Sequence, residues 1–235
     1  MLKSQTAFQY QVSPPVGRFI ERFTYWCFEI FLWNSLFRWR TKVHGSPPDA
    51  AFVLVSNHGS YLDWLFTDVI LRRKFRREVF FLAKRKVVGN LIWDLLARHC
   101  KTIVFADSAK TKAIVLASHI LTNGNSTNHP IVGIFPEGTR SRTGEQIAHS
   151  EGAAWLAKKH DTLIVPVALC GFWEAWPPQR KFPCLKKQRL AVHFLNPIRP
   201  ADFPDEKTAM DFAMNQIYAV VKSEREASHR KRFST

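Results

Sequence analysis

The chain has 235 residues, of which 46% are hydrophobic, and it carries a formal net charge of +15 at pH 7. This length suits one well-packed domain, and the hydrophobic fraction excludes wholesale disorder. The charge favours an acidic partner, which could be anionic lipid, an acidic carrier protein or nucleic acid. Because the sequence contains no RNP-like pattern, zinc finger or recognisable helix-turn-helix, nucleic acid is the runner-up among these partners.

The four cysteines are scattered and form no CxxC pair. A disulfide framework or a zinc site normally shows closer spacing, so we predict free thiols in a reducing compartment. Residues 1–16 are mixed and polar, without an apolar stretch or a small-residue cleavage site, and they do not resemble a cleavable signal. The cysteines are Cys27, Cys100, Cys170 and Cys184.

An aromatic-rich segment, residues 16–40, follows Pro14 and Pro15 and predicts an amphipathic helix. Glu29 divides its apolar run, whereas a membrane-spanning helix needs ~18 or more nearly uncharged residues. Aromatic side chains beside arginines suit a helix that lies in the membrane interface, and the basic charge favours that interpretation. The alternative, which stays open, is a helix that packs on the domain with its aromatic side chains in the core.

Beyond residue 45, apolar runs alternate with helical patterns. This alternation predicts a single α/β domain, with a mostly parallel sheet flanked by helices and an N-terminal amphipathic helical arm. Strands are predicted over residues 51–55, 79–83, 102–105, 131–135, 163–169 and 188–195. Helices are predicted over residues 61–71, 91–96, 109–121, 150–160 and 205–226, with a loop at 122–129 and a frayed basic tail at 229–232. The predicted division is 1–44 for the N-terminal tail and interfacial helix, 45–200 for the α/β domain, and 201–235 for the C-terminal helix and basic tail.

The strand predicted over residues 51–55 delivers a histidine to its end. The segment that follows, residues 56–64, reads SNHGSYLDW and contains His58 and Asp63. Five positions on a regular helix turn a side chain about 140° away from its partner, so the two cannot meet on one helix face. If His58 lies on the turn before the helix, Asp63 can reach back and make the other ring nitrogen a better base. The alternative is an ordinary loop histidine beside a helix-capping aspartate.

A second strand end carries residues 135–141, which read FPEGTRS. Gly138 permits a tight turn there, and Arg140 offers a planar fork of donors that suits a phosphate group. Free backbone N–H groups nearby could hold an anion or a developing oxyanion. Taken alone, this segment is equally compatible with a turn that contains a salt bridge.

Together, the two segments resemble the glycerolipid acyltransferase family, the PlsC-like lysophosphatidic acid acyltransferases and their relatives. That family has an N-H-x4-D block and a later F-P-E-G-T-R-S block, and residues 57–63 and 135–141 match both without a mismatch. A following strand with a buried proline suits the family's last block, so the resemblance covers roughly residues 52–171. In the intermediate block, Lys84 and Gly89 fill two places, but the expected arginine is missing near Asp107, which bears on the identity of the acceptor.

The resemblance implies direct acyl transfer from a thioester to a hydroxyl group, with no acyl-enzyme and no metal. The implied catalytic residues are His58, which would take the proton from the acceptor hydroxyl, and Asp63, which would orient His58 and stabilise the imidazolium. Arg140, with Lys84, would hold the phosphate of the acceptor, and Glu137 would position its glycerol or the surrounding loop. The implied substrate-binding residues are Lys84, Glu137, Gly138, Thr139 and Arg140.

The same resemblance implies a lyso-lipid acceptor such as lysophosphatidic acid, with acyl-CoA or acyl-carrier protein as the co-substrate and no other cofactor. The enzyme would act in phospholipid biosynthesis or remodelling, as a monotopic or peripheral protein bound to anionic lipid at the cytoplasmic face of a membrane. No nucleic acid is expected. The alternative function is a non-catalytic basic module that binds membrane or nucleic acid on an acyltransferase scaffold. Intact His58, Asp63 and Arg140 argue against that alternative.

Overall fold

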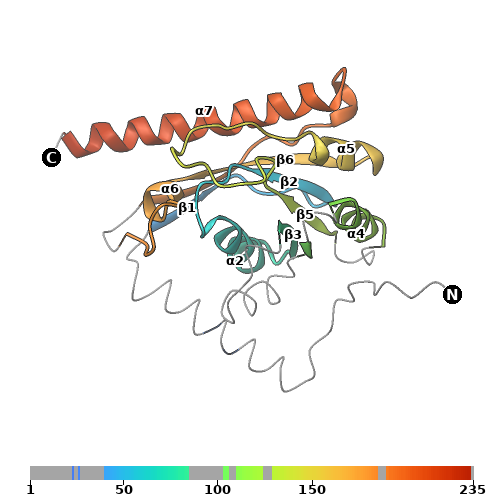
Figure 1. Ribbon diagram of the computed structural model, residues 1–235, viewed down its shortest axis with the longest axis horizontal. Helices are drawn as coiled ribbons and strands as arrows, with labels where there is room; N and C mark the ends of the chain where they lie inside the picture. The colour runs from blue at the N-terminus through green and yellow to red at the C-terminus, as the bar shows by residue number, and fades with distance from the viewer. Residues whose placement is uncertain are drawn as a thin grey trace.

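The computed structural model describes Phe23, Trp26 and residues 40–84, 103–105, 110–123, 129–184 and 189–233. Most of the predicted N-terminal helix and the helix predicted over residues 91–96 lie outside this described part, as do Gly89, Cys27 and Cys100. Within it, one sheet is covered by helices on both faces, which confirms the predicted α/β fold (Figure 1).

The sheet contains seven strands in the described part of the chain, and most neighbours run parallel. From edge to edge the order is β1-β7-β6-β2-β5-β3-β4, with β6 and β7 antiparallel. The central strand is β2, which has β5 and β6 as parallel neighbours. The strands are β1 (Arg40–His44), β2 (Phe52–Ser56), β3 (Val79–Lys84), β4 (Ile103–Phe105), β5 (Ile131–Ile134), β6 (Leu163–Cys170) and β7 (Arg189–Phe194).

The helices divide between the two faces of the sheet. The first face, around Phe52 and Leu54 of β2, is covered by α2 and α6, whereas α4, α5 and α7 cover the other face around Val53 and Val55. In Figure 1, α2 lies below the sheet and α7 runs along the top of the molecule. The helices are α2 (Asp63–Phe75), α4 (Lys110–Asn123), α5 (Gly152–Lys159), α6 (Phe172–Ala175) and α7 (Glu206–Phe233), with a 3-10 turn, η4 (Pro200–Asp202).

The position of β2 follows from its sequence, FVLVS, which is apolar without alternation and is therefore buried on both faces. Its four apolar side chains are completely buried, and each contributes roughly 1.5–3 kcal/mol to folding. Two strands that follow each other in the chain, β5 and β6, lie on opposite sides of β2. The order of the strands therefore reverses at β2. Open α/β sheets bind ligands at the carboxyl ends of the strands next to such a point.

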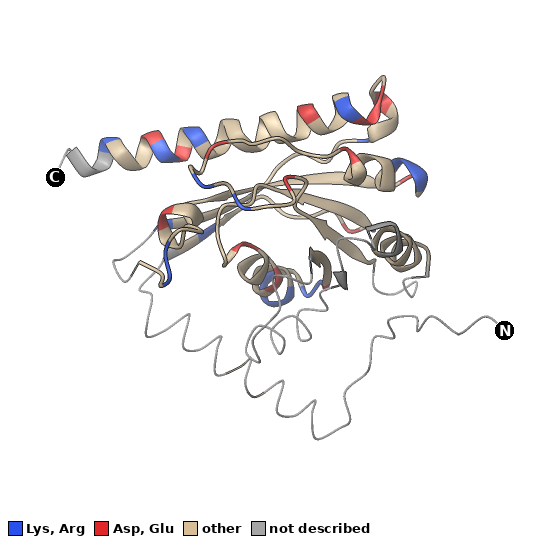
Figure 2. Ribbon diagram, viewed as in Figure 1, with Lys and Arg blue, Asp and Glu red and all other residues tan. Residues whose placement is uncertain are grey.

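The predicted apolar face of α7 is confirmed, because it packs against the sheet through buried Met210, Ala213, Met214, Ile217 and Val221. Charged side chains of both signs occur along the same helix, as Figure 2 shows. None of the helices that the structure describes has the length and hydropathy needed to cross a membrane.

Three elements differ from the sequence-based expectation, one of which is the short helix α6, for which no helix is predicted. The first strand, β1, has no predicted counterpart, because the sequence groups residues 40–44 with the N-terminal arm. It is an edge strand that pairs in parallel with β7, and its Val43 packs against the core. One apolar side chain is too weak a pattern to indicate a strand. The last helix, α7, reaches Phe233 instead of ending near residue 226, because its sequence contains no Gly or Pro that would stop it. The predicted basic tail at 229–232 is therefore helical.

Candidate active site

The two polar segments singled out in the sequence meet at one edge of the sheet. Since β2 and β5 are parallel neighbours, residues 57–63 and 135–141 leave the sheet at the same edge. The backbone N–H of Ser141 donates a 2.8 Å hydrogen bond to the carbonyl oxygen of His58. The His58 imidazole stacks on the Phe135 ring, with the ring centroids 4.3 Å apart. These two contacts join the turn after β2 to the loop after β5.

His58 and Asp63 form a hydrogen-bonded pair, as the sequence predicts for a turn that enters a helix. Nδ1 of His58 lies 2.9 Å from Oδ2 of Asp63, the first residue of α2. The same oxygen accepts hydrogen bonds from the backbone N–H groups of Gly59 and Ser60 at 2.8 and 2.7 Å. Asp63 is fully buried, whereas 18% of the His58 side chain is exposed. An ionised carboxylate only accepts hydrogen bonds, so in the neutral imidazole Nδ1 is the donor and Nε2 keeps its lone pair.

Two further side chains fix this turn to neighbouring elements. Asn57 donates from Nδ2 to the carbonyl oxygen of Leu169 in β6 at 3.0 Å, and its Oδ1 accepts from the Leu169 N–H at 2.8 Å. The Ser60 hydroxyl donates to the carbonyl oxygen of Trp176, just after α6, at 2.9 Å. Each bond contributes about 0.5–1.5 kcal/mol. His58 therefore lies on a braced turn, in contrast to the histidine of an ordinary loop.

Glu137 connects α7 to the backbone of His58. Its Oε1 accepts a 2.7 Å hydrogen bond from the Tyr218 hydroxyl and a longer one, at 3.4 Å, from the backbone N–H of His58. Its Oε2 is buried and has no hydrogen-bond partner among the residues that the structure describes. Burial raises the pKa of Glu137 to about 7, although both hydrogen bonds act to lower it, and the nearby charge of Asp63 adds to the rise.

The guanidinium group of Arg140 lies over the turn that carries His58. Its Cζ atom is 3.5 Å from the centre of the Tyr61 ring, and Tyr61 belongs to that turn. Its Nη1 atom is shielded from solvent and has no hydrogen-bond partner within the described residues. A stacked, planar guanidinium with an unused donor is suited to bind a phosphate oxygen.

The other predicted substrate-binding residues lie at the same edge of the sheet. Gly138 has a φ of +63°, and its N–H donates to the Phe135 carbonyl oxygen at 3.0 Å, so the turn favours glycine as predicted. Thr139 is exposed beside it. Lys84 ends β3, which runs parallel to β5, but its side chain lies outside the described residues.

Two residues of α7 that the sequence did not single out hold this region together. Tyr218 interrupts the apolar face of the helix, which is the one signal that could have identified it. Arg225 donates to Glu174 at 2.9 Å and to the Gly144 carbonyl oxygen at 3.2 Å, and it also pairs with Glu145. The C-terminal helix therefore braces the loop that follows the FPEGTRS segment.

The fold and the site define a class of protein: an α/β domain with a histidine–aspartate pair beside an arginine loop, at the carboxyl edge of a parallel sheet. Such a pair can take a proton from a hydroxyl group, and the arginine can hold an anion close by. The family model described as Acyltransferase matches residues 40–170, more than half of the 235 residues. The protein therefore belongs to the acyltransferase family.

The chain is similar to relatives from mammals and bacteria. It is 26% identical over 201 residues to the 1-acyl-sn-glycerol-3-phosphate acyltransferase alpha of Bos taurus. The matched residues make up 79% of this chain and 65% of that protein. It is also 26% identical over 176 residues to the 1-acyl-sn-glycerol-3-phosphate acyltransferase of Bacillus subtilis. The matched residues make up 72% of this chain and 80% of that protein. The chain thus spans just under two thirds of the length of the bovine relative.

A solved structure supports the fold. The crystal structure of the 1-acyl-sn-glycerophosphate (LPA) acyltransferase PlsC from Thermotoga maritima matches with a TM-score of 0.64 and 21% sequence identity. The match covers 89% of this chain and 80% of that one. At this identity the likeness concerns the fold, and it agrees with the mostly parallel α/β architecture.

Proposed function

We propose that this protein transfers a fatty acyl group from acyl-CoA or acyl-carrier protein to the free hydroxyl of lysophosphatidic acid or a related lyso-lipid. The observation that carries the proposal is the 2.9 Å contact between His58 Nδ1 and Asp63 Oδ2, which leaves Nε2 of His58 free to accept a proton. Membership of the acyltransferase family and similarity to relatives named for this reaction support it.

In the proposed mechanism, Nε2 of His58 takes the proton of the acceptor hydroxyl while its oxygen attacks the thioester carbonyl carbon. Asp63 holds the imidazole in the reactive tautomer and stabilises the imidazolium that forms. Collapse of the tetrahedral intermediate breaks the carbon–sulfur bond, and the imidazolium returns its proton to the leaving thiolate. The ester and the free thiol are the products, and His58 ends in its starting state. General-base catalysis of this kind contributes ~10²–10⁴-fold.

The acceptor is held by its phosphate in this proposal. Arg140 supplies the main contact, because its buried Nη1 lacks a partner among the described residues and its ring partner Tyr61 lies in the turn of His58. Lys84, at the end of β3, is placed at the same edge and can add a second positive charge. Glu137 acts on the loop, since its described contacts are with Tyr218 and the His58 backbone.

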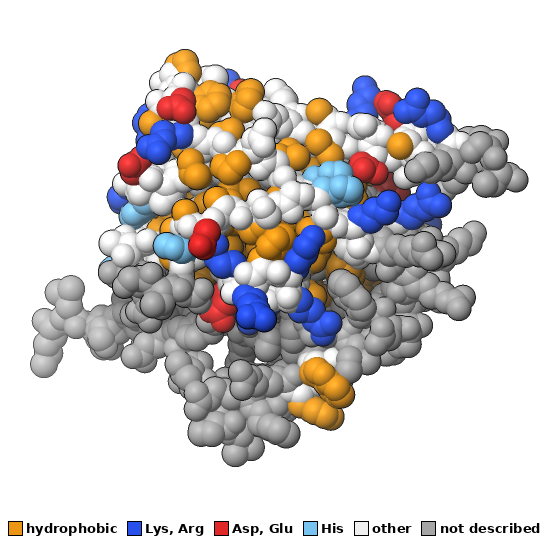
Figure 3. All heavy atoms as spheres, turned by 180° about the vertical axis from the view of Figure 1, so that it is seen from behind, with side chains coloured by type: hydrophobic (Ala, Val, Ile, Leu, Met, Phe, Trp, Pro, Cys, Tyr) orange, Lys and Arg blue, Asp and Glu red, His pale blue; other side chains and the backbone are white. Residues whose placement is uncertain are grey.

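The proposed substrates are lipids, so the protein has to meet a membrane surface. Phe23 and Trp26 support an interfacial role for the N-terminal arm, because both are helical, stack with ring centroids 6.1 Å apart, and are 54% and 55% exposed. Exposed aromatic rings suit insertion among lipid head groups. Figure 3 shows apolar and basic side chains mixed on the face opposite to that of Figure 1, and the net charge of +15 favours anionic lipid.

Deletion of residues 1–39 tests this arm without removing β1, which begins at Arg40. We expect the shortened protein to be released from vesicles that contain phosphatidylglycerol, while the full chain sediments with them and stays free of neutral phosphatidylcholine vesicles. Persistent binding of the shortened protein would show that the arm is not the anchor.

The reaction itself is tested with the purified full-length protein, acyl-CoA or acyl-carrier protein, and lysophosphatidic acid. We expect thiol release together with phosphatidic acid, identified by mass spectrometry. A monoacylglycerol that lacks the phosphate is the matched control acceptor, and it should react poorly. If neither donor is consumed while the protein binds oligonucleotides in a salt-dependent way, the non-catalytic alternative is favoured and the proposed function is wrong.

A further inference from the structure

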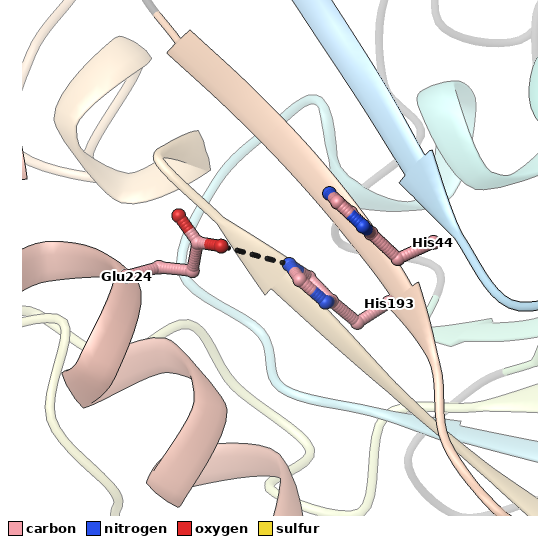
Figure 4. A group of neighbouring side chains, drawn as sticks. All are labelled: His44, His193 and Glu224. Carbon is pink, nitrogen blue, oxygen red and sulfur yellow. Dashed lines mark ion pairs between the residues drawn. The ribbon is translucent and has the colours of Figure 1, made fainter. Parts of the chain in front are cut away.

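A second cluster of polar side chains lies where the edge strand β1 pairs in parallel with β7. His44 ends β1 and pairs in register with His193 of β7. Their imidazole rings stack with centroids 4.2 Å apart and planes within 7° of parallel. Glu224, from α7, reaches toward them and places Oε1 3.3 Å from Nε2 of His193 (Figure 4). None of the three residues belongs to the two motifs of the candidate active site.

The three side chains offer a set of atoms that could bind a metal ion. One imidazole nitrogen from each histidine and one carboxylate oxygen lie within 4.8 Å of one another. Two imidazoles and a carboxylate form a borderline-soft donor set, which suits Zn²⁺, whereas Mg²⁺ and Ca²⁺ prefer oxygen ligands. Three protein ligands would leave one tetrahedral position for water or another ligand.

His193 is the member that most needs a partner. Its Nε2 atom is buried and makes no well-formed hydrogen bond among the residues that the structure describes; its contact there is the 3.3 Å ion pair with Oε1 of Glu224. Buried polar atoms are seldom left in this condition.

The side chains of His44 and Glu224 have room to move toward a bound ion. Zinc lies ~2.0–2.2 Å from nitrogen and oxygen ligands, so the three atoms have to draw together from their present spacing. The parallel rings of His44 and His193 have to tilt toward each other, because their lone pairs lie in the ring planes. His44 is exposed and 40% of the Glu224 side chain is exposed, so both have room to turn while His193 stays in place.

We propose that His44, His193 and Glu224 bind one divalent transition-metal ion, for which Zn²⁺ is the best match. Such an ion would join the edge strands β1 and β7 to the last helix. Glu224 precedes Arg225, which holds the loop around Gly144, so the ion would also stabilise the brace of the candidate active site. This role is structural and does not depend on the proposed acyl transfer.

The test is a calorimetric titration of chelator-treated, full-length protein with ZnSO₄, with MgSO₄ as the control cation. We expect one Zn²⁺ per chain, no comparable Mg²⁺ binding, and a rise in melting temperature with Zn²⁺. His44→Ala, His193→Ala and Glu224→Gln should each weaken Zn²⁺ binding by at least ~10-fold, because even an outer partner of a ligand is worth that much. They should also abolish the thermal shift.

His149→Ala is the matched control variant. His149 also pairs with a carboxylate of α7, that of Asp211 at 2.9 Å, but belongs to no three-ligand group in the described part of the chain. We expect this variant to bind Zn²⁺ like the parent. If His193→Ala fails to fold, the exposed His44 still provides the test through His44→Ala. Saturable binding that survives His44→Ala unchanged, or no Zn²⁺ binding by the parent, would overturn the proposal.

Discussion

The hydroxyl group of Tyr218 donates a 2.7 Å hydrogen bond to Oε1 of Glu137, and through it the last helix reaches the loop that supports His58. Burial of Tyr218 and the adjacent negative charge raise its pKa, so the phenol keeps its proton and acts as the donor. The order of the loop therefore depends on a residue far from both sequence motifs.

Replacing Tyr218 with Phe removes this donor and keeps the ring. We expect the free energy of unfolding to fall by about 1.5–3 kcal/mol under mildly alkaline conditions, where Glu137 is ionised, because hydrogen bonds to charged groups have this strength. Urea unfolding measures the change. A double-mutant cycle with Glu137→Ala, which removes the acceptor, is the control: if the two effects simply add, the hydrogen bond does not couple the residues.

Glu137 makes stability depend on pH in a defined direction. Its pKa rises from 4.5 to about 7 on folding, so between these values the native state binds the proton more tightly than the unfolded chain. Stability from this group is therefore full below about pH 4.5 and declines as the pH rises toward 7. At one pKa unit per 1.36 kcal/mol, the total loss is roughly 3 kcal/mol.

The variant Glu137→Gln measures this effect, since glutamine is neutral at every pH and its oxygen can still accept from Tyr218. We expect the variant to gain stability relative to the parent as the pH rises across this interval. Denaturant unfolding of both proteins over a pH series provides the comparison. A difference that stays constant with pH would mean that Glu137 does not titrate in this range.

Arg140→Lys keeps the positive charge but loses the planar stacking on Tyr61 and the forked donors. We expect KM for lysophosphatidic acid to rise about 10–100-fold, which corresponds to a charged hydrogen bond of about 1.5–3 kcal/mol, with a smaller change in kcat. The control is Lys159→Ala, because Lys159 is another cation over an aromatic ring, Trp155, at 4.8 Å on α5. An unchanged KM, or an equal loss with an acceptor that lacks phosphate, would contradict the phosphate assignment.

The sequence alone predicts the core strands and the His58–Asp63 pair because their signals are local. The unbroken apolar run of β2 indicates a buried strand, and the spacing of the pair permits contact only across a turn. The edge strand β1 is not predicted because its contact with the core is made by Val43, and one apolar residue does not form a recognisable strand pattern. The last residues of α7 are not predicted to be helical because a run of basic residues is as typical of a solvated tail as of a helix.

Contacts between distant segments could not be predicted in this way. Asn57 matches its motif, but nothing in the sequence indicates that it clamps the backbone of Leu169. Tyr218 meets Glu137 only because α7 packs across the sheet, and His44 meets His193 only through the register of β1 with β7. Such contacts depend on strand order, which a pattern of residues along the chain does not contain.

The central claim is that His58 removes the proton of the acceptor hydroxyl, and the most direct test is kcat of the His58→Ala variant with saturating lysophosphatidic acid and acyl-CoA. His160→Ala is the control, since His160 is hydrogen-bonded to Ser118 at 2.6 Å outside the site. We predict that His58→Ala folds like the parent, as judged by circular dichroism, and loses ~10²–10⁴-fold in kcat, while the control keeps its activity. A folded His58→Ala variant that retains most of its turnover would contradict the claim.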